Sequence, residues 1–249
     1  MGQSLNNPPA WSCPHCGSIA PEQVTVCNAR LRSEQLPIPP ILPTCTACGA
    51  ELACNVHATV NPEIRVIVIT GTCASGKKTI AQLLARRHGF RIIDGNIVRD
   101  VVRHKLGIRN AQFNGDEMVA EITREIDILA ALHQDIVLSH VIIPDDLPRY
   151  RSVFRQRQLR YRIVLLQPDC AVAVARSRER ICFTGVTDEY WIRHFHEQLS
   201  VLEQQEQPDV IVYDNGGESA EESAEKILRL YQGEGEYPRE PRSCARPHT

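Results

Sequence analysis

The stretch that decides the fold is residues 64–79, IRVIVITGTCASGKKT. Residues 64–70 form a β-branched run typical of a strand buried in a parallel sheet. A glycine-rich turn from Gly71 to Gly76 follows, and Lys77 opens a segment with helical periodicity. This order predicts a phosphate-binding loop, because backbone N–H groups and the helix N-terminus then face the phosphates and Lys77 reaches the terminal ones.

The whole loop is expected to bind a nucleotide, through Gly71, Thr72, Cys73, Ala74, Ser75, Gly76, Lys77, Lys78 and Thr79. The residue after the loop lysine is usually a Ser or Thr whose hydroxyl ligates Mg²⁺. Here it is Lys78, so water or Thr79 is expected to take that role. The order G-K-x-T resembles adenylate kinase, and the stem G-x-x-A-S-G-K resembles uridine kinase. These resemblances imply ATP and Mg²⁺ as ligands.

Apolar runs and helical patterns alternate after the loop. The expected strands are 64–70, 91–93, 136–143, 162–166 and 210–213. The expected helices are 78–88, 97–106, 117–132, 147–159, 171–180, one capped by Thr187 with Trp191, Phe195, Leu199 and Leu202 facing inward, and one around 224–231. This alternation predicts a five-stranded parallel sheet with helices on both faces over residues 62–232. Together with the phosphate loop it resembles P-loop kinases, which implies their three-layer α/β fold. Ligands then bind at the carboxyl edge of the sheet.

A candidate acceptor site follows the second strand, at Asp94-Gly95-Asn96-Ile97-Val98-Arg99. It resembles the D-G-D-x-x-R segment of adenylyl-sulfate kinases, with Asn96 in place of the second acid. A carboxylate at a strand end can orient or deprotonate an acceptor hydroxyl, and Arg99 can hold an anionic acceptor. The alternative is that Asp94 only caps the next helix.

Two arginines, Arg176 and Arg180, stand one helical turn apart before a short loop. This arrangement resembles the lid of nucleoside-monophosphate kinases, which implies that they stabilise charge on the transferred phosphoryl group. The alternative is a solvated helix face. The last strand is followed by Asp214-Asn215-Gly216-Gly217, which resembles the adenine-contacting loop of these kinases and makes Asn215 a candidate nucleotide contact.

Residues 1–60 predict a separate metal module. Cys13 and Cys16 form one C-x-x-C-G motif, and Cys45 and Cys48 form a second. Four thiolates held by two such turns suit a closed, structural Zn²⁺ site. The pair of motifs resembles a zinc ribbon.

The rest of the composition excludes some classes. The chain has 249 residues, with 28 basic and 30 acidic residues and a net charge of −2, so no strongly basic nucleic-acid binder is implied. An arginine-rich stretch at 149–162 leaves a local patch open. No apolar run approaches the roughly 18 residues of a membrane span, and a cytoplasmic protein is expected. Residues 233–249 are expected to form a disordered tail.

These observations favour an ATP-dependent kinase with a small-molecule hydroxyl or phosphate as acceptor. Two alternatives remain open. One is an ATP-binding regulatory protein without phosphoryl transfer, which Lys78 and Asn96 favour. The other is a nucleic-acid end kinase that uses the zinc module and the arginine-rich stretch. The sequence does not name the acceptor or the oligomeric state.

Overall fold

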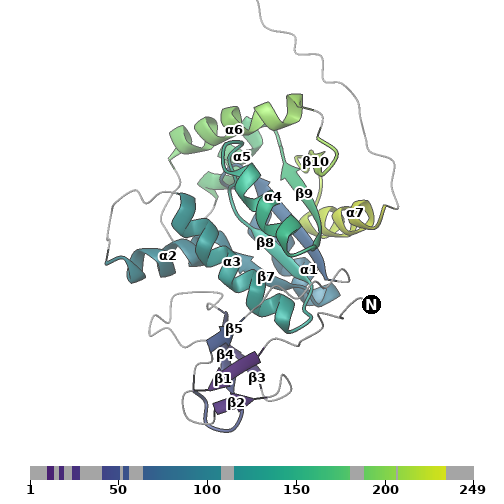
Figure 1. The fold of residues 1–249 in the computed structure, drawn as a ribbon. Helices are drawn as coiled ribbons and strands as arrows, with labels where there is room; N and C mark the ends of the chain where they lie inside the picture. Colours follow the sequence, from purple (N-terminus) through teal and green to yellow (C-terminus); the bar gives the residue numbers. More distant parts are fainter. Residues whose placement is uncertain are drawn as a thin grey trace, which may run out of the picture.

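The protein is described here by a computed structural model of the chain (Figure 1). It describes residues 10–13, 17–19, 24–28, 41–50, 53–55, 64–107, 115–179, 188–205 and 207–233, with side chains at 45–50 and from 64 onward. No helix of this described part is both long and apolar enough to cross a bilayer.

A five-stranded parallel sheet forms the centre of the molecule. Its strands are β6 (Arg65–Gly71), β7 (Arg91–Asp94), β8 (Ile136–Ser139), β9 (Arg160–Leu166) and β10 (Val210–Tyr213). They lie in the order β10-β9-β6-β8-β7, so β6 is the central strand. Because all pairings are parallel, every strand ends at the same edge. The sheet predicted from the sequence is confirmed, and the phosphate loop leaves its middle strand.

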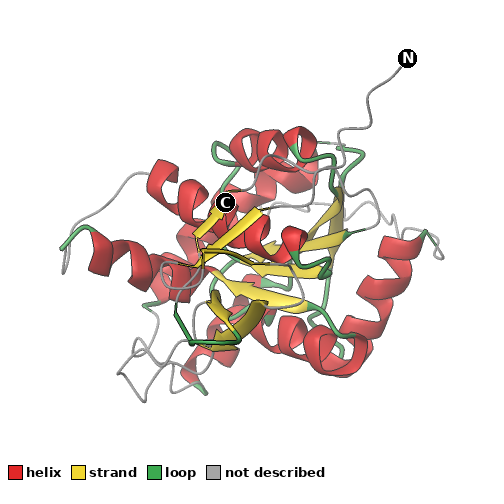
Figure 2. Cartoon of the chain, turned by 60° about the horizontal axis from the view of Figure 1, so that its bottom comes forward, coloured by secondary structure: helices red, strands yellow, loops and turns green. Residues whose placement is uncertain are grey.

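Helices cover both faces of this sheet (Figures 1 and 2). They are α1 (Lys77–His88), α2 (Gly95–Lys105), α3 (Gly115–Ala131), α4 (Leu147–Gln156), α5 (Cys170–Arg178), α6 (Glu189–Gln204) and α7 (Ala220–Gln232). The apolar residues of α1 and α7 pack on one face. Those of α2, α3, α4 and α6 pack on the other.

Strand β6 explains why the central run of sequence is continuously apolar. Successive side chains of a strand point to opposite faces. Val66 and Val68 join the core beneath α3 and α4, whereas Ile67 and Ile69 join the core beneath α1 and α7. All four side chains are fully buried. Both faces of the strand therefore exclude water, and no polar alternation is tolerated.

Four expectations from the sequence need correction. The third strand ends at Ser139 rather than at residue 143, because the Ile142 N–H donates to the side-chain hydroxyl of Thr70 and not to a backbone carbonyl of β6. Helix α4 ends at Gln156. The N-cap of α6 is Asp188, whose carboxylate accepts from the Tyr190 N–H. The inward face of α6 keeps Leu199 and Leu202, and Phe195 packs against their cluster, but Trp191 is 46% exposed.

The N-terminal strands form two small antiparallel sheets. One has the order β2-β1-β5, from β1 (Ala10–Cys13), β2 (Gly17–Ile19) and β5 (Ala53–Asn55). The other pairs β3 (Val24–Asn28) with β4 (Ile41–Cys45). The C-terminal tail predicted at 233–249 lies, beyond Gly233, outside the described residues.

Candidate active site

The phosphate loop wraps around the ammonium group of its own lysine. Lys77 Nζ donates to the carbonyl oxygen of Gly71 at 2.9 Å and to that of Thr72 at 2.6 Å. Gly71 has φ +143°, and a Cβ there would lie 2.5 Å from the carbonyl oxygen of Leu166 on β9. The loop therefore starts where only glycine fits, because the neighbouring strand is backbone that cannot move aside.

Two distant segments clamp this loop. Thr72 is buried, and its hydroxyl donates to the Ile192 carbonyl of α6 at 2.7 Å. From the other side, Asn215 Nδ2 donates to the Ser75 carbonyl at 2.8 Å. Gly76 has φ +101°, and a Cβ there would come 3.2 Å from that same Nδ2. The side chain of Asn215 thus fixes the shape of the loop.

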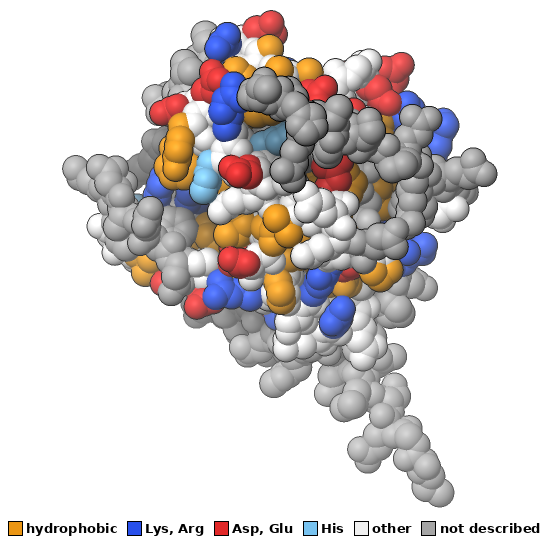
Figure 3. Space-filling model, turned by 90° about the horizontal axis from the view of Figure 1, so that it is seen from above, with side chains coloured by type: hydrophobic (Ala, Val, Ile, Leu, Met, Phe, Trp, Pro, Cys, Tyr) orange, Lys and Arg blue, Asp and Glu red, His pale blue; other side chains and the backbone are white. Residues whose placement is uncertain are grey.

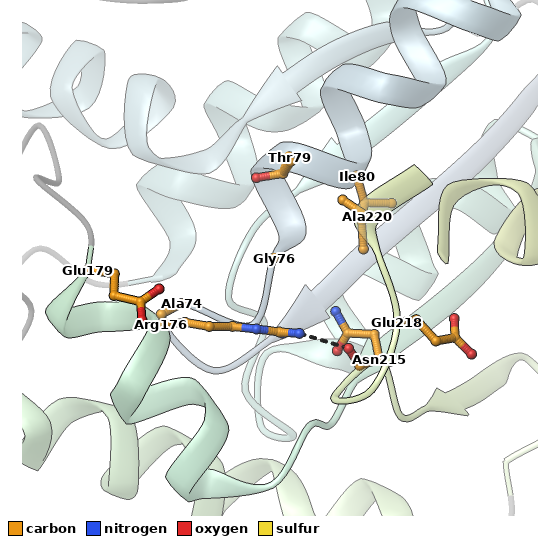
Figure 4. A pocket seen from close by; sticks show the side chains of 9 residues that line it. All are labelled: Ala74, Gly76, Thr79, Ile80, Arg176, Glu179, Asn215, Glu218 and Ala220. Atoms are coloured by element: carbon orange, nitrogen blue, oxygen red, sulfur yellow. Dashed lines mark hydrogen bonds between the residues drawn. The ribbon is translucent and has the colours of Figure 1, made fainter. Parts of the chain in front are cut away.

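A cavity of about 410 Å³ opens beside the loop (Figure 4). Its lining is Ala74, Gly76, Thr79, Ile80, Arg176, Glu179, Asn215, Glu218 and Ala220. Arg176 Nη2 donates to the carbonyl of Asn215 at 2.8 Å and approaches that of Gly216 at 3.4 Å. The structure therefore brings Arg176 and Asn215 together at one wall. Arg180, the other predicted lid arginine, lies outside the described residues.

Not every loop residue faces this cavity. Cys73 is partly buried and packs against Ala173, Val174 and Ile192, which join α5 to α6. Its side chain therefore supports the loop from behind. Ser75 is buried, with its hydroxyl 3.5 Å from Lys77 Nζ.

The candidate acceptor site lies two strands away, at the end of β7. The Asp94 side chain is 1% exposed, and its Oδ2 lies 3.2 Å from Lys78 Nζ. Its Oδ1 accepts from the Asn96 N–H at 2.9 Å, so Asp94 is the N-cap of α2 as well. The two sequence interpretations of Asp94 are therefore compatible, because each concerns a different oxygen. Lys78 turns toward this carboxylate.

His140 packs against the first residue of α2. A Cβ on Gly95 would lie 2.2 Å from His140 Nδ1. The pKa of His140 is lowered to about 3, mainly by burial, with the charges of Lys77 and Arg99 contributing. His140 is therefore neutral at physiological pH, and its low pKa makes it a weak base. The His140 side chain packs between the start of α2 and the sheet.

Arg99 and Glu125 are two further charged residues on the acceptor side of the site. The charge of Arg99 acts on His140, and its Nε has no hydrogen-bond partner among the described residues. Glu125 of α3 is buried, with no described partner for its Oε1. The pKa of Glu125 is raised to about 8, mainly by burial; the charge of Arg124 counteracts part of the rise, and those of Glu121 and Asp94 contribute to it. Sequence reasoning missed Glu125; its one signal is an acid beside Ile122, Ile126 and Leu129 on the inner stripe of α3.

The predicted zinc ligands are only partly described. Cys45 is buried, Cys48 is exposed, and neither forms a disulfide. The turn that they span closes with the Gly49 N–H donating to the Cys45 carbonyl at 2.7 Å, and Gly49 has φ +73°. Cys16 and the side chain of Cys13 lie outside the described residues. Within the described part, no group of three or more His, Cys, Asp or Glu residues is arranged to hold a metal.

Three of the six arginines in the arginine-rich stretch pair with acids. Arg151 pairs with Asp209 at 2.7 Å, Arg149 with Asp146 at 2.9 Å, and Arg157 with Asp127. On the face seen in Figure 3, the described acidic and basic side chains are interspersed. Arg155, Arg160 and Arg162 have no such ion pair among the described residues, so the nucleic-acid alternative stays a prediction.

The comparisons with known proteins agree with this fold. Residues 67–182 match a family model described as an AAA domain. A sugar kinase from a Janibacter species has a TM-score of 0.50 at 20% identity, over 68% of this chain and 95% of its own. The Deinococcus radiodurans tunicamycin resistance protein has a TM-score of 0.50 at 19% identity, over 68% of this chain and 95% of its own. A putative kinase from Chloroflexus aurantiacus has a TM-score of 0.50 at 15% identity, over 69% of this chain and 98% of its own. No curated protein sequence matches the chain.

The parallel sheet, its strand order and the loop after β6 define the class of protein. Residues 64–233 form a P-loop kinase fold, as the sequence predicted. Fold alone does not assign the reaction, because related architectures carry many activities.

Proposed function

We propose that this protein transfers the γ-phosphoryl group of ATP to a hydroxyl or phosphate group of a small molecule. The observation that carries the proposal is the buried carboxylate of Asp94 at the carboxyl edge of the sheet, joined at 3.2 Å to a lysine of the phosphate-loop helix. A buried carboxylate beside a phosphate loop suits the activation of an acceptor. Lys78 beside Asp94, and the charges of Lys77 and Arg99 that act on His140, favour an anionic acceptor.

In the proposed reaction, the acceptor oxygen attacks the γ-phosphorus and the bond from that phosphorus to the β–γ bridging oxygen breaks. ADP leaves with the electron pair of that bond. The hydroxyl proton passes to Asp94 Oδ2. Lys77 and the loop amides bind the β- and γ-phosphates. Asn215 and Arg176 form the cavity wall against which the adenine base of ATP packs.

A magnesium ion bound with ATP would neutralise phosphate charge. The residue that usually supplies a hydroxyl to it is Lys78 here, and a lysine ammonium cannot ligate a cation. Thr79 lines the cavity one residue further on and is the hydroxyl that this loop offers. The residues therefore fit a magnesium ion held mainly by the phosphates and water.

The test is incubation of the protein with Mg·ATP and a pooled metabolite extract, followed by mass spectrometry. We expect a new phosphorylated compound that disappears with Lys77→Ala and with Asp94→Asn. Nucleotide binding without any product, across pools that include nucleic-acid ends, would contradict the proposal.

The second candidate is an ATP-binding regulatory protein. The same ion pair favours it, because Lys78 occupies the carboxylate that an acceptor would use. The two functions differ in single-turnover transfer, which only the kinase performs.

We also propose that Cys13, Cys16, Cys45 and Cys48 hold a structural zinc ion. Cys13 at the end of β1 pairs with Gly17 at the start of β2, and Gly49 supports the turn that contains Cys45 and Cys48. Elemental analysis of the purified chain should give one zinc per molecule, and Cys45→Ser should lose it. Full zinc content in Cys45→Ser, or no zinc in the unaltered chain, would contradict this proposal.

A further inference from the structure

The second lysine of the phosphate-loop helix has no place in the usual nucleotide-binding scheme. Lys78 stands in the first turn of α1, directly after the loop lysine, where a hydroxyl residue is usual. Lys77 turns back onto the loop carbonyls of Gly71 and Thr72, whereas Lys78 reaches out to Asp94. The two neighbouring ammonium groups therefore serve opposite sides of the site.

The buried carboxylate of Asp94 requires a positive charge nearby, and Lys78 supplies it. With its side chain 1% exposed, an ionised carboxylate without a countercharge would be costly. Oδ1 is held by the Asn96 N–H, so Oδ2 is the oxygen on which an acceptor hydroxyl would depend. Lys78 lies 3.2 Å from that oxygen. In the nucleotide-free protein the acceptor-binding oxygen is therefore in ion-pair contact with Lys78, although it accepts no hydrogen bond from the described residues.

Lys78 is also able to leave. Its side chain is 30% exposed, and a lysine stem is flexible with a compact charge at its end. Its backbone lies in the first turn of the helix that faces the phosphates, so the β- and γ-phosphates arrive within reach of the same ammonium group. Several phosphate charges compete there with one carboxylate charge.

We propose that Lys78 is a positioning residue shared between Asp94 and the terminal phosphates of the nucleotide. Without nucleotide it holds Asp94. When nucleotide binds, its ammonium group turns to the phosphates, and Asp94 Oδ2 becomes available to the acceptor hydroxyl. Nucleotide then binds before the acceptor. This inference rests on the proposed function for the role of Asp94, but the exchange of partners itself needs no acceptor.

The test is a double-mutant cycle on nucleotide affinity, measured by calorimetry with the magnesium complex of a non-hydrolysable ATP analogue. Four proteins are compared: the unaltered chain, Asp94→Asn, Lys78→Met and the double variant. Asp94→Asn should bind the analogue about 5- to 10-fold more tightly, because Lys78 is released to the phosphates. In the Lys78→Met background the same change should alter affinity less than about 2-fold. Lys78→Arg should restore the dependence on Asp94.

An equal gain from Asp94→Asn in both backgrounds would overturn the proposal, because the carboxylate would then act only through its field. No gain in either background would overturn it as well. AMP, which lacks the terminal phosphates, is the matched ligand control and should show no coupling.

A second measurement avoids any variant that fails to fold. The chain contains only four lysines, at 77, 78, 105 and 226, so NMR of ¹³Cε-labelled lysine is readable. The Lys78 signal should move on addition of the ATP analogue and stay in place with AMP. An unmoved Lys78 signal would contradict the exchange. Coupling between Lys78 and Asp94 in the absence of phosphoryl transfer would contradict the proposed function alone. Phosphoryl transfer with no coupling between the two residues would contradict this inference alone.

Discussion

The donor side and the acceptor side of the site are built in different ways. The donor side consists mainly of backbone: the loop carbonyls that hold Lys77, and the Ser75 carbonyl held by Asn215. The acceptor side consists of side chains from separate elements, namely Asp94, Lys78, His140 and Glu125. A backbone cradle accepts any nucleotide with the right phosphates, whereas a side-chain site sets which acceptor is used. The comparison predicts that substitutions on the two sides affect different steps.

The largest effect is expected at Asp94. Asp94→Asn keeps the shape and an acceptor for the Asn96 N–H but removes the proton acceptor and the countercharge of Lys78. Phosphoryl transfer should fall by about 10²- to 10⁴-fold, the range for loss of an acid–base group. Single-turnover kinetics with the acceptor found by mass spectrometry would measure it. A loss of transfer rate below 10-fold would mean that Asp94 acts only as the N-cap of α2.

The next effect is expected on the donor side, at Lys77. Lys77→Ala removes the ammonium group that reaches the terminal phosphates, so nucleotide affinity should fall by about 10²-fold. Calorimetry measures the change. Arg86→Ala, on the exposed side of the same helix, is the matched control and should bind nucleotide normally. An equal loss in both variants would point to damage to α1 instead.

A smaller effect is expected where α2 meets the sheet. Gly95→Ala places a Cβ 2.2 Å from His140 Nδ1, so the imidazole must move. Overpacking of this kind lowers the free energy of unfolding by about 1–3 kcal/mol. Gly217→Ala, whose Cβ meets nothing within 4 Å, should change it by less than about 0.5 kcal/mol. Adding His140→Ala to Gly95→Ala should recover part of the loss; no recovery would exclude this contact as the cause.

The smallest effect is a dependence of stability on pH through Glu125. Its pKa is raised from 4.5 to about 8 in the folded chain, so the folded state holds a proton that the unfolded state has lost, and stability falls as pH rises from about 4.5 to about 8. His140, with a pKa lowered to about 3, opposes this only below its ordinary value of 6.5. Between pH 6.5 and 8 the loss should be about 1–2 kcal/mol by denaturant unfolding.

Glu125→Gln should remove that loss, because the amide does not titrate. The groups that act on Glu125 are Arg124, Lys105, Glu121 and Asp94, all of which remain in the variant. The same slope in Glu125→Gln would assign the effect to another group.

The contrast between the two sides also explains what the sequence could predict. The phosphate loop is contiguous in sequence, so residues 64–79 were enough to place Lys77 and the central strand. The acceptor side depends on contacts between residues far apart in the chain: the packing of His140 on Gly95, and the burial of Glu125. The ion pair between Lys78 and Asp94 spans 16 positions and follows from the neighbouring helix and strand, not from either motif.

The third strand illustrates a limit of apolar patterning. Residues 136–143 are almost continuously apolar, but the sheet ends at Ser139, where the Thr70 hydroxyl accepts from the Ile142 N–H. Apolar residues after that point are buried by a turn, and Ile142 is fully buried without being in a strand. Burial fixed the residue types there, and hydrogen bonding fixed the backbone.

The most direct test of the central claim uses ATP with an ¹⁸O-labelled γ-phosphoryl group in the metabolite mixture. If the protein is a kinase, a small molecule gains the labelled phosphoryl group on its own unlabelled oxygen, and Lys77→Ala abolishes that product. If the label appears only in inorganic phosphate, or remains in ATP that is tightly bound, the protein does not transfer phosphoryl groups to small molecules.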